Sequence, residues 1–81
     1  MYLKLFVSKE CPKCPAAKEA VQQVGREVEI FDIDEVDGLA EAAFYGVLCT
    51  PSLLVVDDSG HEVRGWRCEV PNVRDITSAL N

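Results

Sequence analysis

The sequence predicts an α/β domain in which three helices flank a four-stranded mixed β-sheet, in the order β-α-β-α-β-β-α. Three observations support this class. Short runs rich in Leu, Val, Ile and Phe alternate with stretches whose apolar residues recur at helical spacing. The run 52–56 is apolar and β-branched, which is typical of a strand buried on both faces. The turn signal at 57–60 then folds the following strand back as a hairpin.

The first half of the chain predicts a strand, a helix and a second strand. Residues 2–8 are rich in Leu, Phe and Val, as strands are. A stretch with two cysteines and two prolines, 11–15, leads into a helix over 16–24, whose apolar residues share one face. Residues 28–33 alternate apolar side chains with acids and form the second strand. Such a β-α-β unit crosses over right-handed, so its two strands are parallel.

The second half predicts a short helix, a hairpin and a last helix. The helix and the two hairpin strands are expected at 39–45, 52–56 and 62–66. The dipeptide Asp37-Gly38 is expected to break the chain before the short helix. Pro71-Asn72 opens the last helix, which reaches Leu80. No repeat, linker or low-complexity segment interrupts this pattern, so we expect a single domain over residues 1–81.

The composition excludes several classes of function. The net charge is −6, and apolar residues make up 48% of the chain, which fits a folded globular protein. All four lysines lie in residues 1–18 beside a single acid, whereas residues 19–81 are strongly acidic. Binding to nucleic acid needs a basic excess and is therefore not expected. No apolar run approaches the roughly 20 residues of a membrane span, and no secretory leader is recognisable. We therefore expect a cytoplasmic monomer without membrane contact.

Four cysteines, at positions 11, 14, 49 and 68, admit three kinds of chemistry: a secreted disulfide framework, a metal site or a redox pair. A disulfide framework is disfavoured because no secretory signal precedes it. A structural zinc site usually draws on two close pairs, and only Cys11 and Cys14 are close. Redox chemistry at this pair, with no metal or organic cofactor, is the leading interpretation.

The spacing of Cys11 and Cys14 suits a reactive dithiol. They lie three positions apart at the junction of a strand and a helix, so their sulfurs can close a disulfide. The prolines at 12 and 15 are expected in the first helical turn, where a missing N–H costs little. At the open N-terminus of a helix, the macrodipole and Lys13 favour a thiolate over a thiol at Cys11. We expect Cys11 to attack first and Cys14, one turn further, to act second.

A second stretch carries a family resemblance. Residues 45–56 (YGVLCTPSLLVV), together with the CPKC motif at 11–14, resemble the thioredoxin family over essentially the whole chain. The resemblance implies the thioredoxin fold, with a cis peptide bond before Pro51 and the Thr50–Pro51 loop facing the Cys11 sulfur. It also implies that the backbone of Thr50 pairs with an incoming chain in strand-like fashion. Substrate binding would then involve Thr50, Pro51, Pro12 and Lys13.

Within the family, the sequence resembles two branches. Its short length and its CPKC motif are similar to those of glutaredoxins and small glutaredoxin-like thioredoxins. Glu10 stands where larger thioredoxins carry a tryptophan, and Leu5 stands where they carry a buried acid that assists proton transfer. The stretch 64–69 lacks the Gly-Gly and the acidic pair with which glutaredoxins hold glutathione, although Arg67 and Lys13 could still bind its carboxylates.

The leading hypothesis is a thiol–disulfide oxidoreductase that reduces protein disulfides through Cys11 and Cys14. Its electrons would come from a reductase of the thioredoxin-reductase kind or from glutathione, and it would donate them to a cytoplasmic reductase. Two alternatives stay open: a glutathione-dependent glutaredoxin, and a metal-binding module in which the pair holds zinc, copper or an iron–sulfur cluster. A third is a non-catalytic interaction domain of the same fold.

Five further features carry weaker functional hypotheses. Cys49 and Cys68 border the expected site and could form a second disulfide, but two buried small side chains are the favoured interpretation. His61 is expected in an exposed turn, and Trp66 in the core or at its rim. The acids between 32 and 37 are expected on a solvated strand end and not around a metal.

Overall fold

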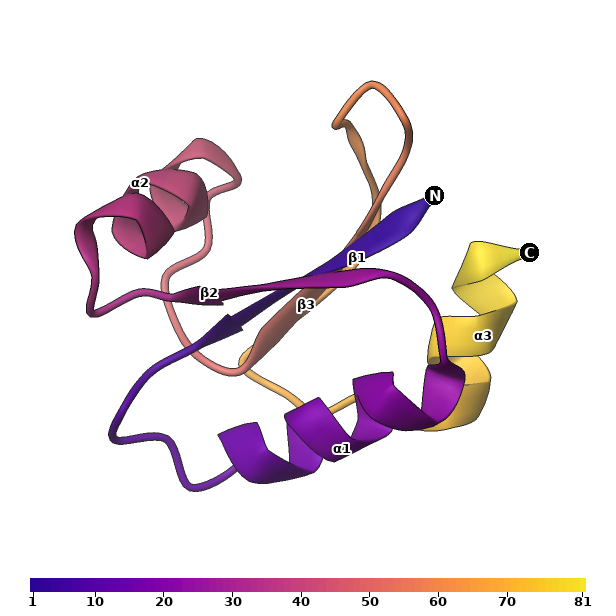
Figure 1. Cartoon of the computed structure of the whole chain (residues 1–81), viewed down its shortest axis with the longest axis horizontal. Helices are drawn as coiled ribbons and strands as arrows, with labels where there is room; N and C mark the ends of the chain where they lie inside the picture. The colour runs from indigo at the N-terminus through magenta and orange to yellow at the C-terminus, as the bar shows by residue number, and fades with distance from the viewer.

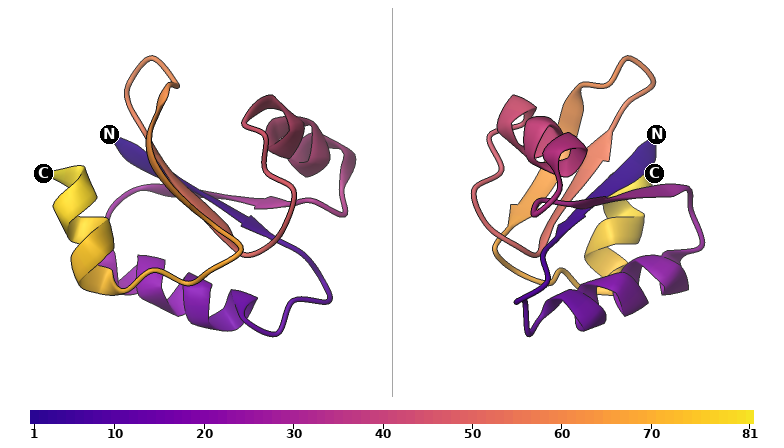
Figure 2. Two further views of the ribbon diagram at one scale, coloured as in Figure 1. Left: turned by 180° about the vertical axis from the view of Figure 1, so that it is seen from behind. Right: turned by 60° about the vertical axis from the view of Figure 1, so that its left-hand side comes forward.

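The computed structural model describes residues 1–81 and confirms the predicted class, three helices around one four-stranded mixed sheet. The strands are β1 Tyr2–Val7, β2 Val28–Asp32, β3 Ser52–Val56 and β4 Glu62–Arg67. The helices are α1 Cys14–Val24, α2 Val36–Phe44 and α3 Val73–Leu80. In the order β2-β1-β3-β4, β1 and β2 are parallel and the other neighbours antiparallel. Helices α1 and α3 cover one face of the sheet and α2 the other (Figures 1 and 2).

The larger core lies between the sheet and helices α1 and α3. Because side chains alternate along a strand, every second residue of β1 and β3 points to this side. The strands contribute Leu3, Leu5, Val7, Leu53 and Val55, and the helices contribute Cys14, Ala17, Ala20, Val21, Ile76 and Leu80. Trp66 of β4 completes this core at 5% exposure, which confirms its predicted place there. The guanidinium of Arg64 lies 4.8 Å from the Trp66 ring centroid and covers its outer side.

The opposite face carries a smaller core under α2, built on Phe6, Leu54 and Val56 of the two central strands. From α2 itself only Gly38 and Ala42 are buried. None of the three helices has the length and apolarity that crossing a bilayer requires.

Lys4 lies in this smaller core, and its burial was not predicted. Its ammonium group forms ion pairs with Glu41 of α2 and, at 3.2 Å, with Glu29 of β2. Three aromatic rings surround the Nζ atom at 5.0 to 5.6 Å: Tyr2, Phe31 and Tyr45. Burial by itself lowers the pKa of Lys4, but the hydrogen bonds and charges of the two glutamates outweigh it and hold the pKa above 10.5. Lys4 therefore fastens α2 to the sheet as a charged group.

Two predicted boundaries were wrong. Helix α2 begins at Val36, and Asp37-Gly38 lies inside its first turn instead of breaking the chain. Gly38 is required there because a Cβ atom would overlap the carbonyl oxygen of Asp32, so the glycine permits close contact between helix and strand. Helix α1 begins at Cys14, two residues earlier than predicted, so Pro12 precedes the helix and only Pro15 lies in its first turn.

We predict that Lys4→Met lowers the free energy of unfolding at neutral pH by about 1–2 kcal/mol, because two carboxylates lose a charged hydrogen-bond donor. The pKa of Lys4 in the folded state is raised above the unfolded value of 10.5. The stabilisation is thus fully present below that pH and is lost as the pH rises through the folded-state pKa. Urea unfolding followed by Trp66 fluorescence, repeated between neutral pH and a pH of about 11, should show a steeper alkaline loss in the wild type than in the variant.

Tyr45 requires a control, because burial also raises its pKa and weakens the fold in the same alkaline range. Both proteins are therefore compared in a Tyr45→Phe background. Equal alkaline slopes with and without Lys4 would contradict the assignment.

Candidate active site

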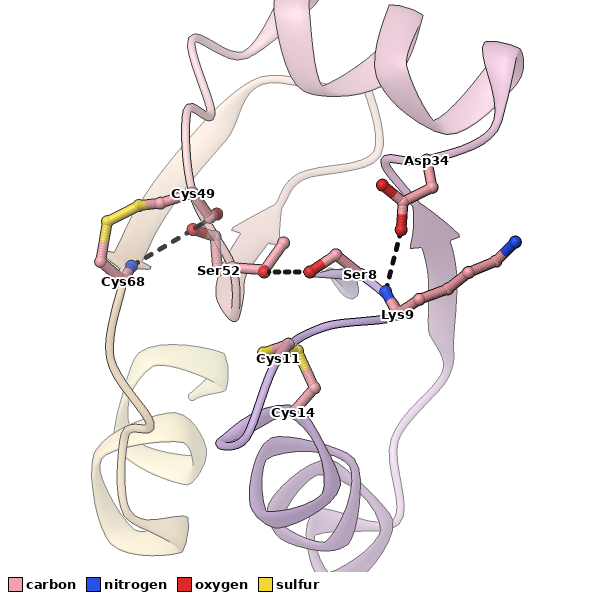
Figure 3. Close-up of a disulfide and its surroundings, with 9 residues drawn as sticks. Ser8, Lys9, Cys11, Cys14, Asp34, Cys49, Ser52 and Cys68 are labelled. Carbon is pink, nitrogen blue, oxygen red and sulfur yellow. Dashed lines mark hydrogen bonds between the residues drawn. A yellow bond between two sulfur atoms is a disulfide. The ribbon is translucent and has the colours of Figure 1, made fainter.

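The two predicted active-site loops meet at one end of the sheet. β1 and β3 are antiparallel, with Phe6 opposite Ser52, so the loop after β1 and the loop before β3 leave the sheet side by side. The first loop carries Cys11 and leads into α1, and the second carries Thr50 and Pro51. Figure 3 shows this end of the molecule, with the Cys11–Cys14 pair between β1 and α1.

Cys11 and Cys14 form a disulfide, with their Cα atoms 5.4 Å apart. The backbone N–H of Cys14 donates to the Cys11 carbonyl oxygen at 3.2 Å, which closes a turn immediately before the helix. Cys14 is the first residue of α1 and is 4% exposed, packed in the larger core. Cys11 is only partly buried. The sulfur of Cys11 is therefore the one that a partner in solution can approach.

The helix end beside the pair favours negative charge. Lys13 caps α1, and the first turn contains no acidic residue, so the positive end of the helix dipole is not neutralised. A cavity of about 300 Å³ opens next to the disulfide. Both cysteines line it together with Lys9, Lys18 and one carboxylate, that of Asp32.

The Thr50–Pro51 loop is tied to the loop that carries Cys11. The Thr50–Pro51 peptide bond is cis, as the resemblance implied, and Pro51 is fully buried. The hydroxyl groups of Thr50 and Ser8 are hydrogen-bonded at 2.7 Å. Ser8 is a site residue that sequence reasoning missed, because a single hydroxyl after a strand carries no signal of its own. Its bond fixes the position of Thr50 relative to the segment that leads to Cys11.

The acids that follow β2 hold the same loop from the other side. The Asp34 carboxylate accepts the backbone N–H of Lys9 at 2.9 Å, and Asp32 accepts the N–H of Asp34 at 2.8 Å. Figure 3 shows Asp34 in contact with the Lys9 backbone. These acids therefore position the loop before Cys11. His61 is exposed in its turn, where its backbone N–H donates to Asp57.

The favoured interpretation of Cys49 and Cys68 was wrong. The two residues form a second disulfide, with Cα atoms 5.4 Å apart, and neither is buried. Their backbones are also joined through the buried hydroxyl of Ser52, which donates to the Cys49 carbonyl at 2.8 Å and accepts the Cys68 N–H at 3.3 Å. The sequence-based argument considered only burial and could not predict this pairing, because the pairing depends on the register of the β3–β4 hairpin.

Arg67 does not offer a free guanidinium for glutathione. It forms two hydrogen bonds of 2.8 Å with the Glu62 carboxylate and a third with the carbonyl oxygen of Tyr45. The hydrogen bonds from Arg67 lower the pKa of Glu62, and the same bonds raise that of Arg67. Of the two cations suggested for glutathione carboxylates, only Lys13 is exposed without such a partner.

Among α/β folds, a cysteine pair at the start of the first helix, one sulfur reachable and one buried, beside a cis-proline loop is the arrangement used by thiol–disulfide oxidoreductases. The protein belongs to that class. Comparison with known proteins places it in one family within this class.

The sequence model of the thioredoxin domain matches residues 1–79. A thioredoxin of Methanocaldococcus jannaschii is 35% identical over 60 residues, which cover 69% of this chain and 71% of that protein. A probable thioredoxin of Archaeoglobus fulgidus is 36% identical over 59 residues, 68% of this chain and 65% of the relative. Thioredoxin 1 of Thermosipho africanus has the same fold, with a TM-score of 0.79 over 99% of this chain and 90% of its own, at 15% identity. The chain belongs to the thioredoxin family.

We predict that Ser52→Ala lowers the free energy of unfolding by about 1–2 kcal/mol, since it leaves the Cys49 carbonyl and the Cys68 N–H without their buried partner. Ser78→Ala is the control, because Ser78 is exposed on α3 and its change should stay within about 0.5 kcal/mol. Urea unfolding under non-reducing conditions measures both. Equal midpoints for the two variants would show that the Ser52 hydroxyl contributes nothing.

Proposed function

We propose that the protein reduces disulfide bonds in other proteins, with Cys11 as the nucleophile and Cys14 as the resolving residue. The difference in burial between the two sulfurs carries this proposal. Cys11 is open to a target, whereas Cys14 is packed in the larger core at 4% exposure. A nucleophile must be reachable, and a resolving sulfur gains from being shielded against other disulfides.

The reaction begins with the reduced pair. The Cys11 thiolate attacks one sulfur of the target disulfide, the target bond breaks, and the other target sulfur leaves as a thiolate that takes a proton from solvent. The Cys14 thiolate then attacks Cys11, the Cys11–target bond breaks, and the second target sulfur leaves. The target has gained two electrons and two protons, and the Cys11–Cys14 disulfide has formed. The Cys14 proton passes to solvent in the adjoining cavity, because Leu5 supplies no acid within the core.

Target binding is assigned to the Thr50–Pro51 loop together with Pro12 and Lys13. The backbone of Thr50 would form strand-like hydrogen bonds with an extended target segment, which aligns the target disulfide with Cys11. The bond to Ser8 supports this role because it holds Thr50 in place before a target arrives. Pro12 and Lys13 directly follow Cys11 in the chain and are exposed.

As the electron source we propose a reductase of the thioredoxin-reductase kind over glutathione. The occupied Arg67 supports this choice, because a guanidinium with three hydrogen bonds would have to release Glu62 to bind a carboxylate. We further propose that residues 1–81 act as one domain, as a monomer and in the cytoplasm. The metal-binding alternative has less support, since no three His, Cys, Asp or Glu side chains converge on one point.

We predict that Cys11→Ser lowers the rate of insulin reduction by about 10³-fold or more, because the sulfur that attacks the target disulfide is gone. Cys14→Ser should retain the first step and accumulate a covalent mixed disulfide between Cys11 and the target. Non-reducing electrophoresis followed by peptide mass spectrometry measures this adduct. The two serine variants are matched controls, since each removes one sulfur of the same pair. A stable adduct in Cys11→Ser would reverse the assigned roles.

We predict rapid NADPH oxidation when the oxidised protein is supplied with NADPH and thioredoxin reductase, and oxidation at least about tenfold slower with NADPH, glutathione and glutathione reductase. The physical reason is that Arg67 stays with Glu62 and does not hold glutathione. Arg67→Ala tests this reason, because it should leave each of the two rates unchanged. Faster turnover with glutathione would make the protein a glutaredoxin in function.

A further inference from the structure

We propose that Cys49 and Cys68 form a second thiol–disulfide site, whose oxidation state sets how tightly the Thr50–Pro51 loop holds a target. The inference rests on the proposed function, in which that loop binds the target chain. Both disulfides lie at the same end of the molecule, where the Cys49–Cys68 bond links the start of the Thr50 loop to the segment that follows β4 (Figure 3).

A chain of contacts connects the second disulfide to the target-binding loop. Ser52 joins the backbones of Cys49 and Cys68, and Arg67, the residue before Cys68, pairs with Ser52 across the hairpin. Thr50 directly follows Cys49, and its hydroxyl is bonded to Ser8. With the disulfide closed, Thr50 is therefore held on both sides. With the disulfide open, the covalent link is lost, and the hydrogen bonds through Ser52, the bond to Ser8 and the cis-proline junction remain.

The backbone of Cys68 indicates that the closed state holds this segment in an uncommon conformation. Cys68 has a φ of 64°, and it is the only residue other than glycine with a positive φ. Left-handed backbone is unfavourable for a side chain with a Cβ atom and persists where surrounding contacts impose it. The contacts that do so here are the disulfide and the single hydrogen bond to Ser52. Opening the disulfide removes one of these two restraints.

The second disulfide is accessible to a reductant. Cys68 is exposed and Cys49 half-buried, so an external thiolate can reach the Cys68 sulfur. A suitable reductant is the reduced Cys11–Cys14 pair of a second copy. Its Cys11 thiolate attacks Cys68, the Cys49–Cys68 bond breaks, and Cys49 leaves as a thiolate.

Cys14 of the attacking copy then displaces Cys68 from Cys11 and closes the Cys11–Cys14 disulfide. The two released thiolates take up the two protons that the donor dithiol has lost. Two electrons have moved from one pair to the other, and no further oxidant or reductant is consumed.

The accessibility of the site is tested on the unmodified protein. It is equilibrated with graded ratios of reduced and oxidised dithiothreitol, quenched with acid, alkylated and digested with trypsin. Cleavage after Arg67 separates Cys68 from Cys11 and Cys14, so each pair is quantified in the same sample. We expect the Cys49–Cys68 disulfide to open at a ratio of reduced to oxidised dithiothreitol that lies within about 100-fold of the ratio that opens the Cys11–Cys14 disulfide. A second pair that stays oxidised beyond this range would overturn the proposal and make the bond purely structural.

The effect on target binding is tested with the double variant Cys49→Ser/Cys68→Ser. We expect KM for insulin to rise about 5-fold or more, with kcat changed less than KM. An aromatic disulfide too small to pair with the Thr50 backbone serves as the reference substrate. Its kcat/KM should differ from the wild type by less than about 2-fold. An unchanged KM for insulin in a folded variant would overturn the proposal.

Two controls separate the possible failures. Far-UV circular dichroism establishes that the double variant is folded, and Cys49→Ala/Cys68→Gly provides a second variant whose residue 68 accepts a positive φ without a side chain. If the wild type reduces neither insulin nor the small aromatic disulfide, the proposed function itself is contradicted. A change confined to KM for insulin concerns only the second site.

Discussion

Antiparallel pairing of β1 with β3 is the constraint on which the rest of the structure depends. Both strands are buried on both faces. A slip of one residue in their register would therefore move every side chain of a strand from one core to the other. That register places the end of β1 opposite the beginning of β3. The loop with Cys11 and the loop with Thr50 then emerge together, and the hydroxyl bond between Ser8 and Thr50 becomes possible. The site is a consequence of strand order.

Core packing and chemistry meet at Cys14. The residue is part of the apolar cluster that includes Leu5, and it is also the sulfur that completes the proposed reaction. A thiolate surrounded by apolar groups is costly, so Cys14 is poorly suited to attack partners in solution. Cys11, three residues before the first residue of the helix, has the opposite environment of solvent, Lys13 and the helix terminus. The fold thereby places two chemically identical side chains in two different environments.

Much of this arrangement could be predicted from the sequence, because it is encoded locally. Strand and helix periodicity and the turn at 57–60 gave the element order, and the CPKC and Thr50-Pro51 motifs pointed to the family. Features that depend on long-range contacts could not be predicted. A glycine is needed at position 38 inside the helix because a Cβ atom there would overlap the Asp32 carbonyl oxygen. Lys4 is buried because two glutamates and three aromatic rings surround its ammonium group. The Cys49–Cys68 bond likewise depends on the hairpin register.

The two faces of the sheet are covered unequally, and this bears on how the molecule unfolds in parts. Helices α1 and α3 bury six side chains in the larger core, whereas α2 buries only Gly38 and Ala42 and is otherwise held by Lys4. Local opening follows the least buried apolar surface. Helix α2 can therefore detach as a separate cooperative unit while β1, β3 and α1 stay assembled. The Cys11–Cys14 pair would stay in place during this local unfolding, because none of the contacts that hold it comes from α2.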